Sequence, residues 1–359
     1  MEIINKTRMP ADVTVHTEID GREALVVVVK GTFRIPDEPG ATVHLHEEQL
    51  PLTMSDEFFG EPGLSAPKYE VDFAPRKHRC DVLLNAAAHA PDGRPATRVT
   101  VGVRIGSWSK SFEVVGDRRR VSGLPGLSWS LAAPFTAMPI TYDRAFGGTD
   151  DKHPDPSHHA AFMANPVGRG FHKQTAPKYI DGTLLPNTEE TGNPVTGFDG
   201  NYRPMSFGPI GRHWHPRAAY AGTYDQHWLD AVFPFLPADF DDRYFQAAPP
   251  DQQLPKPLGE QRVILLNLTA DGRREFVIPA ITAPIVVFPK RGGREDLTGA
   301  LDTLVIEPDA DRVTMTWRVT RLLRRSIFEI AQVYVGRQDR VWTGHDSERV
   351  AASQLIPSP

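Results

Sequence analysis

Apolar residues near the start of the chain form two runs separated by a pair of turn residues. The runs span 13–19 and 24–35, and Asp20-Gly21 stands between them. An Asp-Gly pair between two such runs is a strong sequence signal for a β-hairpin. The four consecutive valines at 26–29 suit a strand buried on both faces, because β-branched side chains pack well on a pleated surface. We therefore expect a hairpin within the first 35 residues.

The same pattern predicts three more hairpins and one further strand. The hairpins join 82–88 to 97–105 across Asp92-Gly93, 262–268 to 275–278 across Asp271-Gly272, and 301–306 to 313–319 across 308–311. Apolar and polar positions alternate roughly over 108–114, which indicates a strand. The run 322–335 fits a strand or a helix, because its periodicity does not separate the two.

These elements indicate a mainly β fold with antiparallel, sandwich-like sheets and few short helices. Segment 117–259 differs in kind, since it holds 18 of the 33 prolines and 19 of the 32 aromatic residues. Proline fixes φ and lacks an N–H donor, so a dense run of prolines favours long ordered loops, which aromatic side chains can anchor. We expect this segment to be an irregular insertion packed on the sheets.

One short helix is expected inside the insertion, from 223 to 229. Thr223 and Gln226 have capping-box spacing, and Pro234 stops the helix from continuing. The chain then divides into an N-terminal β-sheet region (1–116), the loop region (117–259), a C-terminal β-sheet region (260–345) and a tail (346–359). We expect these parts to form one compact unit.

Charge and composition exclude several classes of function. The formal net charge is −5, so the chain has no cationic field to hold a nucleic acid. Its longest apolar stretches are far shorter than the roughly 20 residues that span a bilayer, and the first ten residues contain no apolar core of a signal peptide. A single cysteine, Cys80, rules out an intrachain disulfide. We expect a soluble protein of the cytoplasm that binds neither nucleic acid nor membrane.

Seven of the 13 histidines lie in the irregular segment and raise the possibility of a metal site. His213 and His215 would point to one face of a strand, and Asp150 or Asp151 could supply a carboxylate as third ligand. The chain has no H-E-x-x-H helix, no G-x-S-x-G elbow and no phosphate-binding G-x-x-x-x-G-K-[ST] loop. The sequence therefore predicts no catalytic residue and no cofactor. A metal-dependent hydrolase stays an alternative, as does a carbohydrate-binding sandwich.

Aromatic and arginine side chains are the candidates for binding a polypeptide. An aromatic-lined groove holds an apolar partner segment well, and five residues of the irregular segment are candidates for such a groove: Trp214, Trp228, Phe233, Phe235 and Phe245. Arg144 and Arg169 stand among aromatic residues and glycines, in the stretches 142–150 and 165–171. A buried arginine requires a carboxylate, from its own chain or from a partner.

Several motifs together resemble domain-of-unknown-function family 2169. The resemblance covers roughly 5–319 and is carried by Tyr142 to Asp150, Asn165 to Phe171, Phe207-Gly208-Pro209-Ile210, Trp228, Phe235-Leu236-Pro237, Asp239-Phe240, Tyr244-Phe245-Gln246, Ala248-Pro249, Asp251-Gln252, Asn5-Lys6-Thr7, Val28 to Phe33, Leu301 to Leu304 and Trp317-Arg318.

The resemblance implies a function that spacing alone does not. Members of that family are encoded beside the VgrG and PAAR proteins of the type VI secretion spike, and those studied are implicated as adaptors that load or stabilise an effector. This implies a non-enzymatic adaptor whose partners are a secreted effector or a PAAR or VgrG protein. The family carries no motif known to be catalytic, so no active-site residue is implied.

Overall fold

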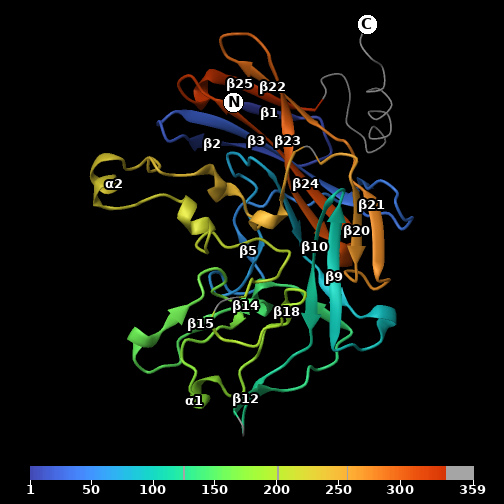
Figure 1. Ribbon diagram of the computed structural model, residues 1–359. Coiled ribbons are helices and arrows are strands. Elements are labelled where there is room, and N and C mark those ends of the chain that lie inside the picture. Colours follow the sequence, from blue (N-terminus) through green and yellow to red (C-terminus); the bar gives the residue numbers. More distant parts are fainter. Residues whose placement is uncertain (124–125, 200–201, 257, 337–359) are drawn as a thin grey trace.

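The computed structural model describes residues 1–123, 126–199, 202–256 and 258–336 as a mainly β protein with two large sheets (Figure 1). The predicted tail at 346–359, and residues 337–345 of the predicted C-terminal region, lie outside the described residues. Strands from before residue 117 and from after residue 259 enter both large sheets, so the two ends of the sequence build one structure together. None of the helices within the described ranges is both long and apolar enough to cross a membrane.

The larger sheet has ten strands, seven of them in the order β1-β25-β22-β23-β24-β3-β2. Most neighbours are antiparallel, but β1 runs parallel to β25 and β7 runs parallel to β23. The strands are β1 (Glu2–Asn5), β2 (Ala11–Thr17), β3 (Glu23–Arg34), β4 (His44–Leu45), β7 (Cys80–Leu84), β19 (Gln253–Leu254), β22 (Ala283–Pro289), β23 (Glu295–Glu307), β24 (Arg312–Leu322) and β25 (Ile330–Val335).

The smaller sheet has five strands in the order β18-β10-β9-β20-β21, and every neighbouring pair is antiparallel. Its strands are β9 (Arg98–Ile105), β10 (Trp108–Val115), β18 (Thr188–Glu189), β20 (Arg262–Leu266) and β21 (Arg273–Val277). Strand β18 comes from the irregular segment, which is therefore joined to this sheet by a backbone ladder.

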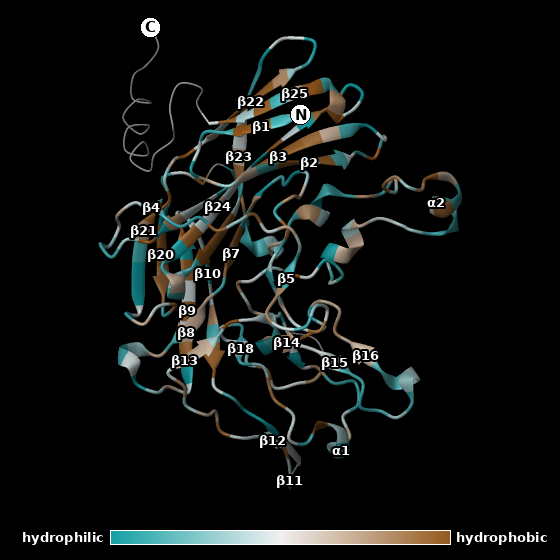
Figure 2. Cartoon of the chain, turned by 180° about the vertical axis from the view of Figure 1, so that it is seen from behind, coloured by the Kyte–Doolittle hydropathy of each residue, from teal (hydrophilic) through white to brown (hydrophobic). Residues whose placement is uncertain are grey.

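The main hydrophobic core lies between the two sheets. Its cluster of buried side chains includes Val29 and Trp317 from the larger sheet with Val101, Phe112 and Leu265 from the smaller sheet. Figure 2 shows the hydrophobic residues concentrated along strands such as β3 and β7. Full burial of one such side chain contributes about 1.5–3 kcal/mol, so this shared core is the main reason why the sheets stay together.

The structure confirms the fold class and most of the predicted hairpins. Strands β2 and β3, β20 and β21, and β23 and β24 pair as expected, and the strand predicted over 108–114 is β10, which pairs with β9. The run 322–335, left open by its periodicity, ends in strand β25 after a short 3₁₀ turn at Ile327–Glu329.

The hairpin predicted across Asp92-Gly93 is wrong. Strand β7 pairs with β23 and β19 instead of β9, and the chain after it forms β8 (Ala87–His89), which pairs with β13 (Ala137–Pro139). Pro91 begins a 3₁₀ turn that includes the Asp-Gly pair. The Asp-Gly signal therefore marks a tight turn correctly, but the pairing partners are chosen by contacts far away in sequence.

The expected short helix is present and begins three residues later than predicted. Helix α2 spans Gln226–Ala231, and its N-cap is Asp225, whose side chain accepts a hydrogen bond from the Trp228 N–H at 2.9 Å. Thr223 does not cap it, because its hydroxyl donates to Asp239. Helix α1 (Pro177–Ile180) is a single turn.

The remaining strands form two-residue to four-residue ladders, most of them in the lower part of Figure 1. They are β5 (Glu57–Phe58) with β6 (Pro67–Tyr69), β11 (Arg120–Gly123) with β12 (Gly126–Trp129), β14 (Phe146–Gly147) with β17 (Arg169–Gly170), and β15 (Thr149–Asp150) with β16 (Ala160–Ala161).

Side-chain hydrogen bonds to the backbone hold this irregular part together. Asn165 is fully buried, and its side-chain amide donates to the carbonyl oxygens of Tyr142 at 2.8 Å and Phe146 at 3.0 Å. Loops without long ladders need such partners, because an unpaired buried carbonyl is costly.

Candidate partner-binding surface

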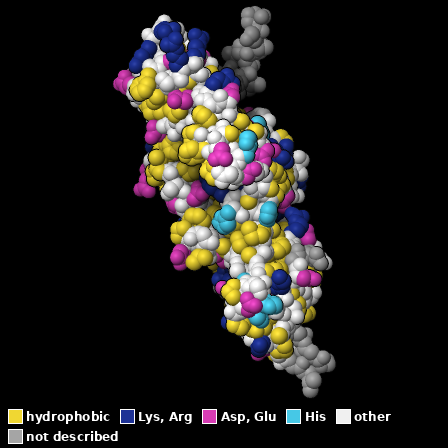
Figure 3. Space-filling view, turned by 90° about the vertical axis from the view of Figure 1, so that its left-hand side faces the viewer, with side chains coloured by type: hydrophobic (Ala, Val, Ile, Leu, Met, Phe, Trp, Pro, Cys, Tyr) yellow, Lys and Arg dark blue, Asp and Glu magenta, His cyan; other side chains and the backbone are white. Residues whose placement is uncertain are grey.

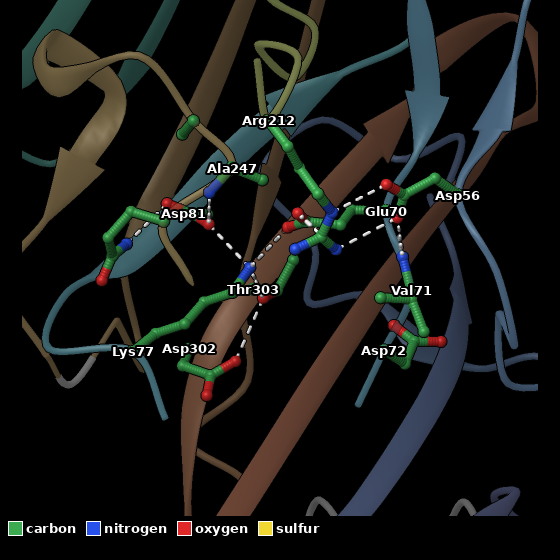
Figure 4. A network of polar contacts seen from close by, with 12 residues as sticks. Asp56, Glu70, Val71, Asp72, Lys77, Asp81, Arg212, Ala247, Asp302 and Thr303 are labelled. Carbon is green, nitrogen blue, oxygen red and sulfur yellow. Dashed lines mark hydrogen bonds and ion pairs between the residues drawn. The ribbon is translucent and has the colours of Figure 1, made fainter. Parts of the chain in front are cut away.

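A buried network of charged residues joins the irregular segment to the larger sheet (Figure 4). It contains five carboxylates and five cations, and each has at least one partner of opposite charge: Asp56, Glu70, Asp72, Asp81, Asp302, Lys30, Lys77, Arg212, Arg217 and Arg318. Arg212 and Arg217 belong to the irregular segment, while Lys30, Asp302 and Arg318 belong to β3, β23 and β24.

The contacts in the network are short and several are fully enclosed. Lys77 Nζ lies 2.7 Å from Asp81 Oδ2 and 3.8 Å from Glu70, and Arg217 pairs with the same Glu70. Arg217 also donates to the carbonyl oxygens of residues 210 and 244, so one guanidinium holds two loops and a carboxylate. The network therefore fixes the base of the loops that follow residue 212.

The charges of the network are balanced, which argues for a structural role. For Asp56, burial raises the carboxyl pKa, but the hydrogen bond from Arg212 and that from the Val71 N–H outweigh it, so that the pKa is lowered. Asp56 is therefore ionised and paired. Charged groups that already pair with one another are not free to bind or react with a ligand. We therefore assign the network a structural role, as the joint between the irregular segment and the larger sheet.

Beyond this joint, residues 222–239 project from the body as an arm that carries α2 (Figure 1). The two limbs are tied at the base, where the Thr223 N–H and hydroxyl donate to Asp239 at 2.9 and 2.7 Å. Gly222 has a φ of 84°, and a Cβ there would come within 2.6 Å of Pro237. A glycine is therefore required at the point where the arm leaves the body.

Trp228 holds the inside of the arm together. Its indole N–H donates to the carbonyl oxygen of Phe235 at 2.9 Å, which connects α2 to the returning limb. Tyr224 and Phe233 lie edge-on to it, with ring centroids 4.8 and 5.5 Å away. The arm thus has a small aromatic core of its own and a defined shape.

The outside of the arm is apolar and acidic. Tyr224, Leu229, Phe233 and Phe235 are exposed by 51%, 55%, 63% and 42%. Residues 222–239 contain three aspartates and no lysine or arginine. Figure 3 looks onto the side from which the arm projects and shows hydrophobic and acidic side chains mixed on this face. Large exposed apolar groups gathered on one projecting element are typical of a protein-binding surface.

The structure brings together only three of the five aromatic residues predicted for a groove. Trp228, Phe233 and Phe235 lie on the arm. Trp214 is 1% exposed in a small core with Tyr142, and Phe245 is buried in another with Phe240, so neither is on the surface. The arm residues Tyr224 and Leu229 were missed, because nothing in their spacing distinguishes an exposed apolar side chain from a buried one.

The predicted arginines lie in another part of the molecule. Arg144 and Arg169 are half-buried in the lower loops, away from the arm. Arg144 has Asp117 at 3.8 Å and the Asn187 side chain at 3.2 Å as partners. Arg169 donates through Nε to the carbonyl oxygen of Asp143 at 3.0 Å.

The residues proposed for a metal site do not form one. His213 and His215 lie in a turn rather than on a strand, both are exposed, and His213 accepts a hydrogen bond from the Trp214 indole at 3.1 Å. Asp150 is 3% exposed and accepts from the N–H groups of residues 173 and 174. Within the described ranges, no three His, Cys, Asp or Glu side chains are grouped so that they could hold a metal ion.

The fold and this surface define a β-rich protein whose most prominent feature is an exposed arm. Residues 20–318 match the family model described as "Uncharacterized protein conserved in bacteria (DUF2169)". Because the match covers most of the chain, this protein belongs to the DUF2169 family. Comparisons with the curated proteins and with the solved structures found no match.

Proposed function

We propose that this protein is a non-enzymatic adaptor, or chaperone, that binds a type VI secretion effector, or its PAAR or VgrG carrier, in the cytoplasm. In this role it promotes loading of the effector onto the secretion spike. The apolar, acidic arm is the observation that carries the proposal. Membership of DUF2169 supports it through the adaptor role that the sequence resemblance implies.

The arm suits the centre of a protein interface. Leu229 and Phe233 are more than half exposed, and covering them would remove apolar surface from water. Aromatic side chains at the centre of an interface commonly contribute most of its binding energy. The internal contacts of Trp228 fix the arm before binding, so less conformational entropy is lost when a partner covers it.

The charge of the arm specifies the chemistry of the partner surface. The arm has three aspartates and no lysine or arginine between 222 and 239, which favours an apolar site bordered by basic residues. Such rim charges mainly accelerate association and are screened by salt. We therefore expect the association rate to fall as salt is added, while the apolar contacts keep the complex together.

The experiment is co-purification with the effector and spike proteins of the same host, comparing the native chain with a variant carrying L229S and F233S. Both side chains are more than half exposed and neither belongs to the core between the sheets, so the variant should fold; F233S also removes the ring contact with Trp228 inside the arm. We expect recovery of a toxin-domain or spike protein to fall about tenfold or more, because loss of interface hot spots costs at least about 2 kcal/mol.

Phe328→Ser is the matched control, because Phe328 is 78% exposed but lies outside the arm. Its recovery of the partner should equal that of the native chain. If the arm variant retains the partner, the arm is not the binding surface. If the native chain recovers neither kind of protein while the secretion apparatus is expressed, the adaptor role is wrong.

A further inference from the structure

A cleft of about 410 Å³ lies in the loops around β14 and β17 and contains no residue of the arm. Its walls are formed mainly by residues 147–149 and 167–172, with Asp143 and residues 183–184 beside them. Small-ligand sites have volumes of roughly 300–1,000 Å³. The cleft is therefore large enough for a small molecule or for one side chain of a polypeptide.

Glycine backbone fixes the walls of the cleft where its two loops touch. Gly148 has a φ of 113°, in the left-handed region, and a Cβ there would come within 2.7 Å of the carbonyl oxygen of Gly168. Strands β14 and β17 pair in parallel at the same place. Arg169 belongs to β17, so its backbone is held firmly at the wall of the cleft.

Arg169 lines the cleft, and part of its guanidinium makes no hydrogen bond with any described residue. Its Nε donates to the carbonyl oxygen of Asp143 at 3.0 Å, and in the described part of the chain neither terminal nitrogen has an acceptor. Burial lowers its pKa, and the nearby Arg144 lowers it further. The charges of Asp117 and Asp143 raise the pKa but do not outweigh these two effects, so the protein compensates the charged form only in part.

Among the residues that the structure describes, one other arginine that is not exposed also lacks a carboxylate in ion-pair distance. Arg120 is 1% exposed and has no carboxylate in ion-pair distance within the described ranges. Its guanidinium lies over the Phe198 ring at 3.9 Å, and its Nε and Nη1 have no hydrogen-bond partner in the described part of the chain. Its Nη2 donates to the carbonyl oxygens of Gly197 and, at 3.4 Å, Gly170, which also lines the cleft. Burial lowers the pKa of Arg120 to about 10.

This pair stands apart from the remaining arginines. Every other arginine that is buried or half-buried in the described ranges has a carboxylate within 4.0 Å. Both exceptions adjoin Gly170, because Arg169 precedes it in the chain and Arg120 donates to its carbonyl oxygen. Among the buried and half-buried arginines of the described ranges, the two without a carboxylate in ion-pair distance therefore lie next to one cleft.

Two carboxylates in the same loops, those of Asp143 and Asp150, do not form an ion pair with Arg169. Asp143 accepts a hydrogen bond from the Ala66 N–H at 3.1 Å, and Asp150 accepts from the N–H groups of residues 173 and 174. Neither carboxylate lies within 4.0 Å of Arg169. His172, also in the lining, adds no charge at pH 7, because burial lowers its pKa to about 4.

We propose that this cleft binds a carboxylate group, with Arg169 as the residue that contacts it. The two terminal nitrogens of a guanidinium match the two oxygens of a carboxylate in a bidentate pair. A ligand with one negative charge suits the site better than a doubly charged phosphate, because Asp143 also lines the cleft and would repel the second charge. The carboxylate belongs to a free small molecule or to a polypeptide, as an acidic side chain or chain end. The proposal is independent of the adaptor role.

The test is a titration of the full chain, with ¹⁵N-labelled arginine, followed through the Nε–H resonance of Arg169. The probes are acetate, the blocked peptides acetyl-Gly-Asp-Gly-amide and acetyl-Gly-Asn-Gly-amide, and inorganic phosphate. We expect acetate and the aspartyl peptide to give saturable shifts and the asparaginyl peptide to give none. Tighter binding of the peptide than of acetate assigns the site to polypeptides, and equal binding assigns it to small carboxylates.

Variants R169K and R104K provide the comparison, followed through backbone amide resonances of the cleft glycines. Arg104, like Arg169, donates through Nε to a backbone carbonyl at 3.0 Å, but it is exposed and lies in β9. R169K should weaken acetate binding about tenfold, since lysine offers one point charge in place of two parallel donors. Equal shifts in both variants, equal binding of phosphate, or no saturable shift with the native chain would overturn the proposal.

Discussion

The two sheets and the irregular segment are stabilised in different ways. In the sheets, buried side chains such as Val101, Phe112 and Trp317 form one continuous apolar cluster, and long ladders satisfy the backbone. In the irregular segment, some side chains such as Phe207 join that main cluster, and the others form small apolar clusters. The backbone of this segment is held by scattered backbone hydrogen bonds and by single polar side chains, of which Asn165 and Arg217 each connect separate stretches of the chain.

This difference shows how a proline-rich segment keeps a defined shape without regular structure. Apolar packing is non-directional and tolerates many arrangements, whereas a hydrogen bond from a buried side chain specifies which carbonyl it meets. The sheets therefore provide most of the stability, and the polar joints decide where the loops and the arm lie.

The strongest test of this difference is removal of a large side chain from the sheet core. Trp317 is 1% exposed, and its indole N–H donates to the carbonyl oxygen of Ile281 at 3.0 Å. We expect Trp317→Ala to lower the free energy of unfolding by about 3–5 kcal/mol, through lost burial and the cavity that remains. Urea denaturation followed by circular dichroism measures it. A loss below about 1 kcal/mol would contradict a continuous core.

Removal of a polar joint should lower the free energy of unfolding less than removal of Trp317, and it should loosen mainly the loops that the joint holds. Arg217→Met removes the guanidinium that pairs with Glu70, and we expect a loss of about 3 kcal/mol, the low end for breaking a buried ion pair. Glu70 keeps Arg212 at 2.9 Å and Lys77 at 3.8 Å, which limits the cost. Hydrogen exchange should accelerate over residues 210–245 and stay unchanged in β3 and β24. Uniform acceleration would show that the loops and sheets are one cooperative unit.

The smallest expected effect concerns the pH dependence of stability. His172 has a folded-state pKa of about 4, lowered by burial from an ordinary value of 6.5. The unfolded chain therefore binds a proton more readily, so this group lowers stability progressively as pH falls from about 6.5 towards 4. With His172→Phe, the urea concentration at the unfolding midpoint should depend less on pH between about 4 and 6.5. An unchanged profile would mean that the loop opens and hydrates the ring before the sheets unfold.

The sequence predicted local structure better than distant pairing. Asp20-Gly21 and Asp271-Gly272 join strands that are neighbours in the chain, so a short pattern is enough to define both hairpins. The parallel pair of β7 with β23 joins Asp81 to Thr303, and no local pattern records such a contact. The mistaken hairpin at Asp92-Gly93 has the same cause.

The exposed residues of the arm, the candidate binding surface, were predicted only in part for a related reason. The aromatic content of the irregular segment indicated anchoring side chains, but it did not separate Trp214, which is buried, from Phe233, which is exposed. The same limit applies to arginine. Whether Arg169 finds a carboxylate as ion-pair partner depends on how separate loops pack together. The spacing of residues along the chain does not predict that packing.

Strand β7 carries the only thiol of the chain. Cys80 is fully buried, and that burial, with the nearby carboxylates of Asp302 and Asp81, raises the thiol pKa. Because the thiolate is the reactive form, maleimide reagents should leave the native protein unlabelled. A single cysteine introduced on the arm beside the proposed contact residues, as in His227→Cys in α2, would then be the sole reactive position. A fluorophore attached there would report the arrival of a partner without any other change to the protein.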